Sequence, residues 1–195
     1  TDEQRMLVEM THDFVEKEML PHEETLERTD ALPPELAESL KKRAIELGLH
    51  ACNLPEEVGG GGLDAVSVML IEKELGRTSL ALAECAHRPL NILASCEGEQ
   101  VTQFLEPTVR GEKRDCIAMT EPGAGSDLRG MKCKAERVGD DWVINGEKHF
   151  ISQASVSDYC VLFAATGSEA FEDQTVKAPR KYISAFLVDF SDPGV

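Results

Sequence analysis

The sequence has 195 residues, of which 42% are hydrophobic and 29% charged, the composition of an ordinary globular protein. Its formal net charge of −16 argues against nucleic acid and against anionic membrane surfaces as partners, because both are bound mainly through basic faces. The longest apolar-rich stretch, Leu63 to Ile71, is far too short to span a bilayer, so we expect no membrane partner.

The first half of the chain is predicted to be helical. Apolar residues recur at helical spacing from Met6 to Phe14, and Pro21 is expected to end or kink this first helix. Four further helices are predicted from their apolar stripes and end signals: Leu36–Leu47 before Gly48; a helix capped by Asp64 that ends at Gly76; one capped by Ser79 that bends at Pro89 and reaches Leu93; and a short one, Val101–Leu105, that stops before Pro107.

Four consecutive glycines, Gly59 to Gly62, separate the second and third predicted helices. Such a run cannot form the interior of a helix or a strand. A phosphate-binding loop is one interpretation, but no Lys-Ser or Lys-Thr follows, as a P-loop requires. We therefore expect a tight connector between two helices.

Strand patterns replace helical ones after about Gly111. The predicted strands are Cys116–Met119, Cys133–Val138, two short strands within Trp142–Ile151 around an Asn-Gly hairpin turn, Tyr159–Ala165 and Tyr182–Phe190. The intervening stretch from Gly167 to Arg180 is predicted to be an exposed loop. Helices followed by strands indicate two domains of different class. Because the sequence stops soon after an apolar strand, we expect the second domain to be truncated.

The six cysteines form no Cys-x-x-Cys motif, and the five histidines have no ligand spacing with them. We therefore expect no metal site. Free thiols suit a reducing compartment, the cytoplasm or, in a eukaryote, the mitochondrial matrix.

The segment from Ala118 to Asp127 carries the clearest chemical signal. It is predicted to be a strand that runs into a Pro-Gly, Ala-Gly loop, where Gly123 and Gly125 permit positive φ and let a ligand approach the backbone. The amides around Gly125 and Ser126, with the Ser126 hydroxyl beside them, suit a pyrophosphate or another anion. A plain β-turn explains these residues equally well.

This segment, with Gly130 three residues later, resembles the first signature of the acyl-CoA dehydrogenase family. Other stretches resemble motifs of the same family in the same order: Pro55–Gly60, Glu74–Arg77, Pro107–Lys113 and Asn145–Ser152. The resemblance covers nearly the whole chain. It implies an α+β multidomain fold, with an N-terminal all-α helical domain over residues 1–112 followed by an incomplete antiparallel β-barrel domain over residues 113–195.

The resemblance also implies FAD as the cofactor. Ile117, Met119 and Thr120 would line the flavin, with backbone groups near the last two meeting its pyrimidine edge. Gly125 and Ser126 would contact the pyrophosphate, and Ser126 would also touch the acyl-CoA.

Three neighbouring residues complete the implied flavin site: Phe150, packed on the ring, Ile151, and Ser152, whose hydroxyl reaches flavin N5. Arg180, in a basic cluster with Lys177 and Lys181, could meet the CoA phosphates, although a solvated loop fits equally well. We assign no catalytic role to His149, which would face away from Phe150 on a strand. Glu121 is expected to brace its loop.

The implied reaction is α,β-dehydrogenation of an acyl-CoA thioester to the trans-2-enoyl-CoA. A carboxylate removes the α proton, the β hydride passes to flavin N5, and the electrons pass to an electron-transferring flavoprotein. Members of the family form homo-oligomers, dimers or tetramers. Their base is a Glu of a C-terminal domain that this sequence lacks, so we assign no catalytic residue and expect the fragment alone to be inactive.

Other functions on the same fold remain open at this point. They are a non-catalytic FAD- or CoA-binding subunit of a mixed oligomer, an acyl-CoA oxidase and a flavin monooxygenase. The acyl group is not predicted. His87 or Arg88 could meet a polar acyl tail, but surface polar groups at a helix kink explain them as well.

Overall fold

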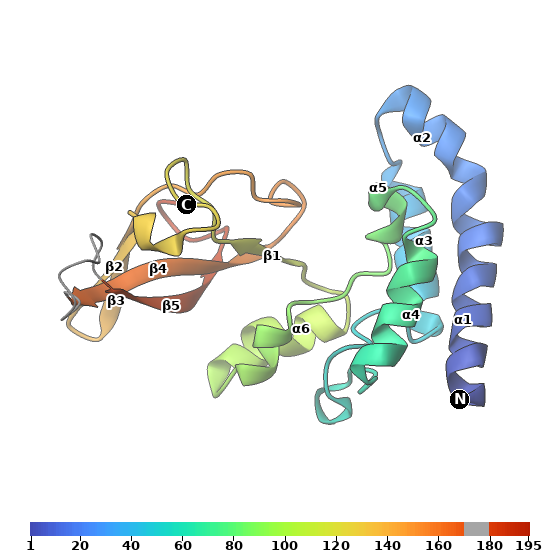
Figure 1. Ribbon diagram of the computed structural model, residues 1–195, viewed down its shortest axis with the longest axis horizontal. Helices are drawn as coiled ribbons and strands as arrows, with labels where there is room; N and C mark the ends of the chain where they lie inside the picture. Colours follow the sequence, from blue (N-terminus) through green and yellow to red (C-terminus); the bar gives the residue numbers. More distant parts are fainter. Residues whose placement is uncertain (170–179) are drawn as a thin grey trace. The chain divides into compact units, whose positions relative to one another are not determined.

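A computed structural model describes residues 1–169 and 180–195. The chain divides into two compact units, Thr1–Lys113 and Arg114–Val195, here called the first and second units (Figure 1). Helices make up the first unit and strands dominate the second. The predicted α+β multidomain class is therefore confirmed.

The first unit is built from six α-helices and short irregular helical turns. The α-helices are α1 (Asp2–Phe14), α2 (Glu23–Thr29), α3 (Pro34–Glu46), α4 (Ala65–Leu75), α5 (Leu80–Ala83) and α6 (Glu106–Val109). Helix α1 packs along α4, and their apolar faces join α3 around a core that includes Phe14, Met19, Leu40, Ile71 and Leu82.

The predicted break near Pro21 is a change of helix type. Helix α1 passes into a π-helical turn, Val15–Met19, and a 3-10 turn, Leu20–His22, before α2 begins. Pro21 lies in the first turn of the 3-10 segment, where its missing N–H group costs little.

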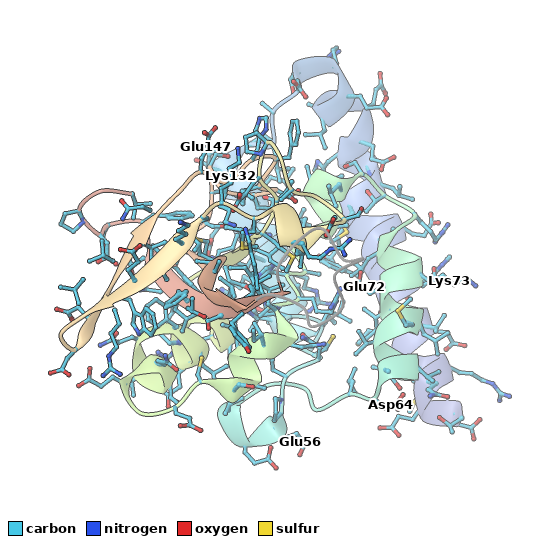
Figure 2. All side chains as sticks on the ribbon, turned by 60° about the vertical axis from the view of Figure 1, so that its left-hand side comes forward. Glu56, Asp64, Glu72, Lys73, Lys132 and Glu147 are labelled. Atoms are coloured by element: carbon cyan, nitrogen blue, oxygen red, sulfur yellow. The ribbon has the colours of Figure 1, made fainter. Side chains whose placement is uncertain are left out.

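Asp64 caps α4 as its position predicts. Its carboxylate accepts hydrogen bonds from the backbone N–H groups of Val66 at 2.8 Å and Ser67 at 3.0 Å. Figure 2 shows Asp64 at one end of α4 and Lys73 toward the other. The cap satisfies two of the donors that a helix N-terminus leaves without partners.

Asp64→Ala is expected to lower the thermal unfolding midpoint of the first unit by about 5 °C, because these donors lose their acceptor. Asp64→Asn should stay close to the wild type, since its side-chain oxygen can still cap the helix. The measurement is circular dichroism at the helical band. Equal midpoints for the alanine and asparagine variants would show that the cap contributes nothing.

The fourth and fifth predicted helices were partly wrong. Helix α5 ends at Ala83, and after a turn and an extended stretch a 3-10 turn follows at Asn91–Ser95. Pro89 contributes to the extended stretch, because proline disfavours helical backbone at the residue before it, here Arg88. The Ser79 side chain makes no capping bond; instead the Glu23 carboxylate accepts the Ser79 N–H at 2.6 Å.

The fifth helical stretch does not stop before Pro107. A π-helical turn, Val101–Leu105, leads directly into α6, and Pro107 lies in the first turn of α6. A proline is tolerated there because the N–H group that it lacks would have no partner within the helix.

The four-glycine run is a close-packed connector between α3 and α4, as predicted. Its backbone returns on the preceding segment through hydrogen bonds from Gly61 N–H to the Ala51 carbonyl at 3.1 Å and from Gly62 N–H to the Leu54 carbonyl at 2.8 Å. A Cβ at Gly60 would lie 2.3 Å from the Leu54 carbonyl oxygen. Glycine is therefore required at Gly60 by the close approach of two backbone segments.

The second unit contains one five-stranded sheet. Its strands are β1 (Asp115–Ala118), β2 (Lys134–Val138), β3 (Asp141–Asn145), β4 (Tyr159–Glu169) and β5 (Arg180–Asp189). Strand β5 runs antiparallel along one edge of β4, while β1 and then β2 pair with its other edge and β3 lies outside β2 (Figure 1).

The expected antiparallel pairing holds for β2–β3 and β4–β5, but β1 and β2 both run parallel to β4. The sheet is therefore mixed. Parallel neighbours need a long crossover, and the chain from the end of β1 to the start of β4 provides one. The sequence pattern of β1 gave no sign of its direction.

The hairpin lies elsewhere than predicted. It joins β2 to β3 through Gly139 and Asp140, with Val138 paired to Asp141, whereas residues 146–150 form no strand. Gly146 serves a different purpose, because a Cβ there would lie 2.5 Å from the Cα atom of Cys133. The glycine thus allows two backbone segments to come into contact.

Within the described residues, no helix is long and apolar enough to cross a membrane. That same part of the chain holds no group of three or more His, Cys, Asp or Glu side chains arranged to bind a metal ion. All six cysteines belong to it and are free thiols.

Candidate functional site

The loop that follows β1 is shaped by a tight turn. Glu121 and Ala124 form a two-residue bridge, with Glu121 N–H donating to the Ala124 carbonyl at 2.9 Å and Ala124 N–H donating back at 3.2 Å. Gly125 and Ser126 follow the turn and are exposed. The β-turn proposed for this segment is therefore present at Glu121–Ala124, and ligand binding by the residues after it stays a prediction.

A second segment, residues 146–152, lies against the end of β1. The Lys148 Nζ atom donates to the Met119 carbonyl at 3.0 Å, and the His149 N–H donates to the Thr120 carbonyl at 2.8 Å. Two successive residues therefore hold two successive carbonyl groups. This contact brings Phe150 next to the Met119–Thr120 edge, although the two segments are far apart in the sequence.

Glu121 is the buried centre of the contact. Its carboxylate accepts the N–H groups of Lys132 at 2.6 Å and Cys133 at 2.9 Å and pairs with Lys148 Nζ at 2.9 Å. The Lys148 and Glu121 side chains are only 7% and 4% exposed. Glu121 therefore ties its loop to the segments that carry these partners, which is the bracing role expected for it from the sequence.

Burial acts to raise the pKa of the Glu121 carboxyl, but its hydrogen bonds with Lys132 N–H, Lys148 Nζ and Cys133 N–H outweigh it and hold the pKa below its ordinary value. A carboxyl whose folded pKa is depressed stabilises the fold above its unfolded pKa, and this contribution is lost as the pH falls through the folded pKa.

The second unit is accordingly expected to lose stability as the pH falls below the ordinary carboxyl value of 4.5. Chemical denaturation at a series of pH values checks this. The loss should be reduced in Glu121→Gln, which has no carboxyl to protonate. An identical acid profile in that variant would show that other carboxyls are responsible.

Phe150 and His149 share one side of the chain, contrary to the alternation expected on a strand. No strand forms here, and Phe150 has a left-handed backbone with φ of 57°. The two rings stack with centroids 3.9 Å apart and planes 15° apart. Phe150 is nevertheless 83% exposed, which is unusual for a large apolar side chain.

The other predicted flavin residues occupy different settings. Ile117 is 42% exposed on the face of β1 opposite the buried Cys116 and Ala118. Ile151 packs against the cluster formed by Cys116, Ala118 and Cys160, whereas Ser152 is exposed. The side chain of Arg180, and the whole of Lys177, lie outside the described residues. The flavin contacts of Ile117, Ile151 and Ser152 remain predictions, as does the contact of Arg180 with the CoA phosphates.

Gly123 and Gly125 do not adopt the positive φ that the sequence permitted. A Cβ on either would meet no protein atom within 4 Å. Among the described residues, moreover, the N–H groups of Gly125 and Ser126 have no hydrogen-bond acceptor. The loop thus offers open space and available donors. The nearby Phe150 ring is stacked on His149 on one side but largely exposed, and this combination fits a ligand with an anionic group and a flat aromatic part.

Lys148 is the residue that sequence reasoning missed. The available signal was a lysine in a motif that already contributed Phe150 and Ser152, together with an acidic residue in the other motif. Elsewhere, Arg88 Nε pairs with Glu72 at 2.7 Å and His87 with Glu84 at 3.7 Å. These pairs favour the interpretation of His87 and Arg88 as polar groups at a helix end.

Comparison with known proteins identifies the class. Residues 1–112 match the model of the acyl-CoA dehydrogenase N-terminal domain, and residues 116–195 match that of the acyl-CoA dehydrogenase middle domain. The chain therefore belongs to the acyl-CoA dehydrogenase family, an FAD-dependent family of oxidoreductases, which confirms the resemblance seen in the sequence.

Individual relatives agree with this assignment. The chain is 35% identical over 196 residues to the mitochondrial short-chain specific acyl-CoA dehydrogenase of Rattus norvegicus, covering 98% of this chain and 45% of the relative. It is 30% identical over 201 residues to the caffeyl-CoA reductase–Etf complex subunit CarC of Acetobacterium woodii, covering 100% of this chain and 50% of that one.

Among solved structures, an acyl-CoA dehydrogenase of Bacillus anthracis complexed with FAD superimposes with a TM-score of 0.77 at 31% identity, covering 100% of this chain and 32% of that one. The chain thus spans half or less of the length of each of these proteins.

Proposed function

We propose that this chain forms the flavin-facing part of an FAD-dependent acyl-CoA dehydrogenase that converts an acyl-CoA thioester to the trans-2-enoyl-CoA. The observation that carries the proposal is the joining of the Met119–Thr120 edge to the Lys148–Phe150 segment by two hydrogen bonds. Family membership supports the reaction class.

The residues of the chain have distinct parts in this proposal. Backbone groups of Met119 and Thr120 bind the pyrimidine edge, the amides of Gly125 and Ser126 bind the pyrophosphate, and the exposed ring of Phe150 covers the isoalloxazine. When bound, FAD supplies the hydride acceptor. The protein contributes orientation and exclusion of water, and no base is assigned among the described residues.

An electron-transferring flavoprotein is the proposed electron acceptor, because one relative is by name a subunit of a complex with Etf. The acyl-CoA is the proposed substrate, and the hydroxyl of Ser126 is proposed as one of its contacts. We further propose a homo-oligomer, as is usual for the family.

The test uses the natural protein that contains this chain. We expect the purified protein to show flavin absorption bands that bleach when a saturated acyl-CoA is added without oxygen. Absence of flavin would contradict the proposal. Bound flavin that no acyl-CoA bleaches would indicate a non-catalytic subunit, and oxygen consumption during turnover would indicate an oxidase.

The contribution of Phe150 can be tested separately. Phe150→Ala is expected to weaken FAD binding about fivefold, because an aromatic stack is worth about 1 kcal/mol. Titration of the apoprotein with FAD measures the dissociation constant. Val138→Ala is the matched control, since Val138 is also exposed but lies at the β2–β3 turn. Equal affinities in both variants would remove Phe150 from the site.

A further inference from the structure

We propose that Lys148 is a positioning residue that tunes the flavin through the Met119–Thr120 peptide group, without touching cofactor or substrate. The inference rests on the proposed function, since it presumes FAD at this edge. It adds a role for a side chain that the sequence pattern did not single out.

The position of the Lys148 ammonium is fixed from two sides. It lies 3.0 Å from the Met119 carbonyl oxygen and 2.9 Å from the Glu121 carboxylate, and its side chain is 7% exposed. A charge this well buried is retained only where it is paired and hydrogen-bonded. The Glu121 carboxylate is itself held by the N–H groups of Lys132 and Cys133. The ammonium therefore has a single well-defined location.

The carbonyl group that the Lys148 ammonium contacts belongs to the peptide unit between Met119 and Thr120. The Met119 carbonyl and the Thr120 N–H are two ends of one peptide unit. A cation at the carbonyl end polarises the unit and makes the N–H a stronger donor, an effect that is larger in a low-dielectric interior. Thr120 N–H belongs to the backbone expected to meet the pyrimidine edge, where negative charge gathers when the flavin is reduced. Lys148 should therefore stabilise the reduced form of the flavin.

Residues 148–150 also fix the position of the Phe150 ring relative to the backbone of Met119 and Thr120. His149 N–H donates to the Thr120 carbonyl at 2.8 Å, and Lys148 donates to the Met119 carbonyl. The peptide groups before and after Thr120 are therefore both hydrogen-bonded to this segment. Phe150 follows directly, so its backbone is attached to the two residues that hold Met119 and Thr120. Loss of Lys148 should therefore loosen the alignment of the ring with its backbone donors, in addition to removing the polarising charge.

The test compares Lys148→Met, which keeps the length but not the charge, with Lys148→Arg, which keeps the charge. In the FAD-loaded natural protein, Lys148→Met is expected to lower the flavin midpoint potential by about 30 mV, a tenfold change in the two-electron equilibrium. FAD affinity should fall about tenfold, because the Thr120 N–H becomes a weaker donor and the backbone donors lose their alignment with the ring. Lys148→Arg should recover most of the potential. Lys132→Met, at an exposed lysine of the same region labelled in Figure 2, is the matched control and should change neither value.

A purely structural role for Lys148 would reduce stability and FAD affinity but leave the midpoint potential of the bound flavin unchanged, and that result would overturn the proposal. If Lys148→Met fails to fold, the double variant Glu121→Gln with Lys148→Met removes both buried charges and is measured in the same way. A wild-type protein that binds no FAD would overturn the proposed function and this inference together. A wild type that binds FAD, with no potential change in the variant, would overturn this inference alone.

Discussion

Glu121→Ala is expected to lower the free energy of unfolding of the second unit by about 3–5 kcal/mol, the usual cost of breaking a buried ion pair from one side. The variant leaves the Lys148 ammonium buried without its counter-charge. It also removes the acceptor for the N–H groups of Lys132 and Cys133, which lie 2.6 and 2.9 Å from the carboxylate. The Met119–Thr120 edge should become disordered as a result.

Trp142 allows the free energy of unfolding of the second unit to be measured separately. It is the only tryptophan of the sequence, and it lies in β3 with its ring 5.5 Å from that of Phe186. Its fluorescence during urea denaturation therefore reports on the second unit. Glu136→Ala, at an exposed position of β2, is the control and should change the stability by less than about 0.5 kcal/mol.

A rescue experiment adds a second check. Adding Lys148→Met to Glu121→Ala should restore part of the lost stability, because it removes the charge that the first substitution leaves unpaired. A cost below about 1 kcal/mol for Glu121→Ala, the range of an exposed ion pair, would show that the pair does not brace the loop.

Gly146→Ala is expected to destabilise the second unit by about 3 kcal/mol, the upper range for overpacking. The added Cβ would lie 2.5 Å from both Cα and Cβ of Cys133 and 2.7 Å from its Sγ atom. Because backbone atoms are among these neighbours, no change of rotamer can relieve the clash. The segment would have to move away from Cys133, and it would take Lys148 and His149 with it.

The matched control is Gly123→Ala in the same unit. A Cβ there meets no protein atom within 4 Å, and the backbone has no positive φ. Its unfolding midpoint in urea, followed by Trp142 fluorescence, should stay near that of the wild type. An equal loss of stability in both variants would mean that the destabilisation comes from replacing glycine backbone with alanine backbone and not from contact with Cys133.

Features that depend on a few neighbouring residues were predictable from the sequence. Asp64 caps α4 because its carboxylate reaches donors only two and three residues ahead. The helix boundary at Gly48 and the strands β4 and β5 follow in the same way from local pattern. The helix predicted from Ser79 to Leu93 shows the limit, because α5 ends at Ala83 although the apolar stripe continues beyond it.

Features set by contacts between distant segments were not predictable in this way. The Asn145–Gly146 pair has the chemistry of a hairpin turn, yet Gly146 is needed where the chain passes Cys133. The loop after β1 could be recognised by its motif, but the ion pair between Glu121 and Lys148 joins two motifs. The direction of β1 likewise depends on its partner β4.

The arrangement of β4 also has a consequence for biosynthesis. Asp115 of β1 pairs with Tyr159 of β4, so the ribosome must add 44 further residues before this pairing can begin. At about 5–20 residues per second, β1 waits roughly 2–9 s for its neighbour. Throughout that interval the nascent strand exposes backbone groups and the side chains of Cys116 and Ala118, which the finished protein covers. The second unit is thus most vulnerable to misassociation while it is still being translated.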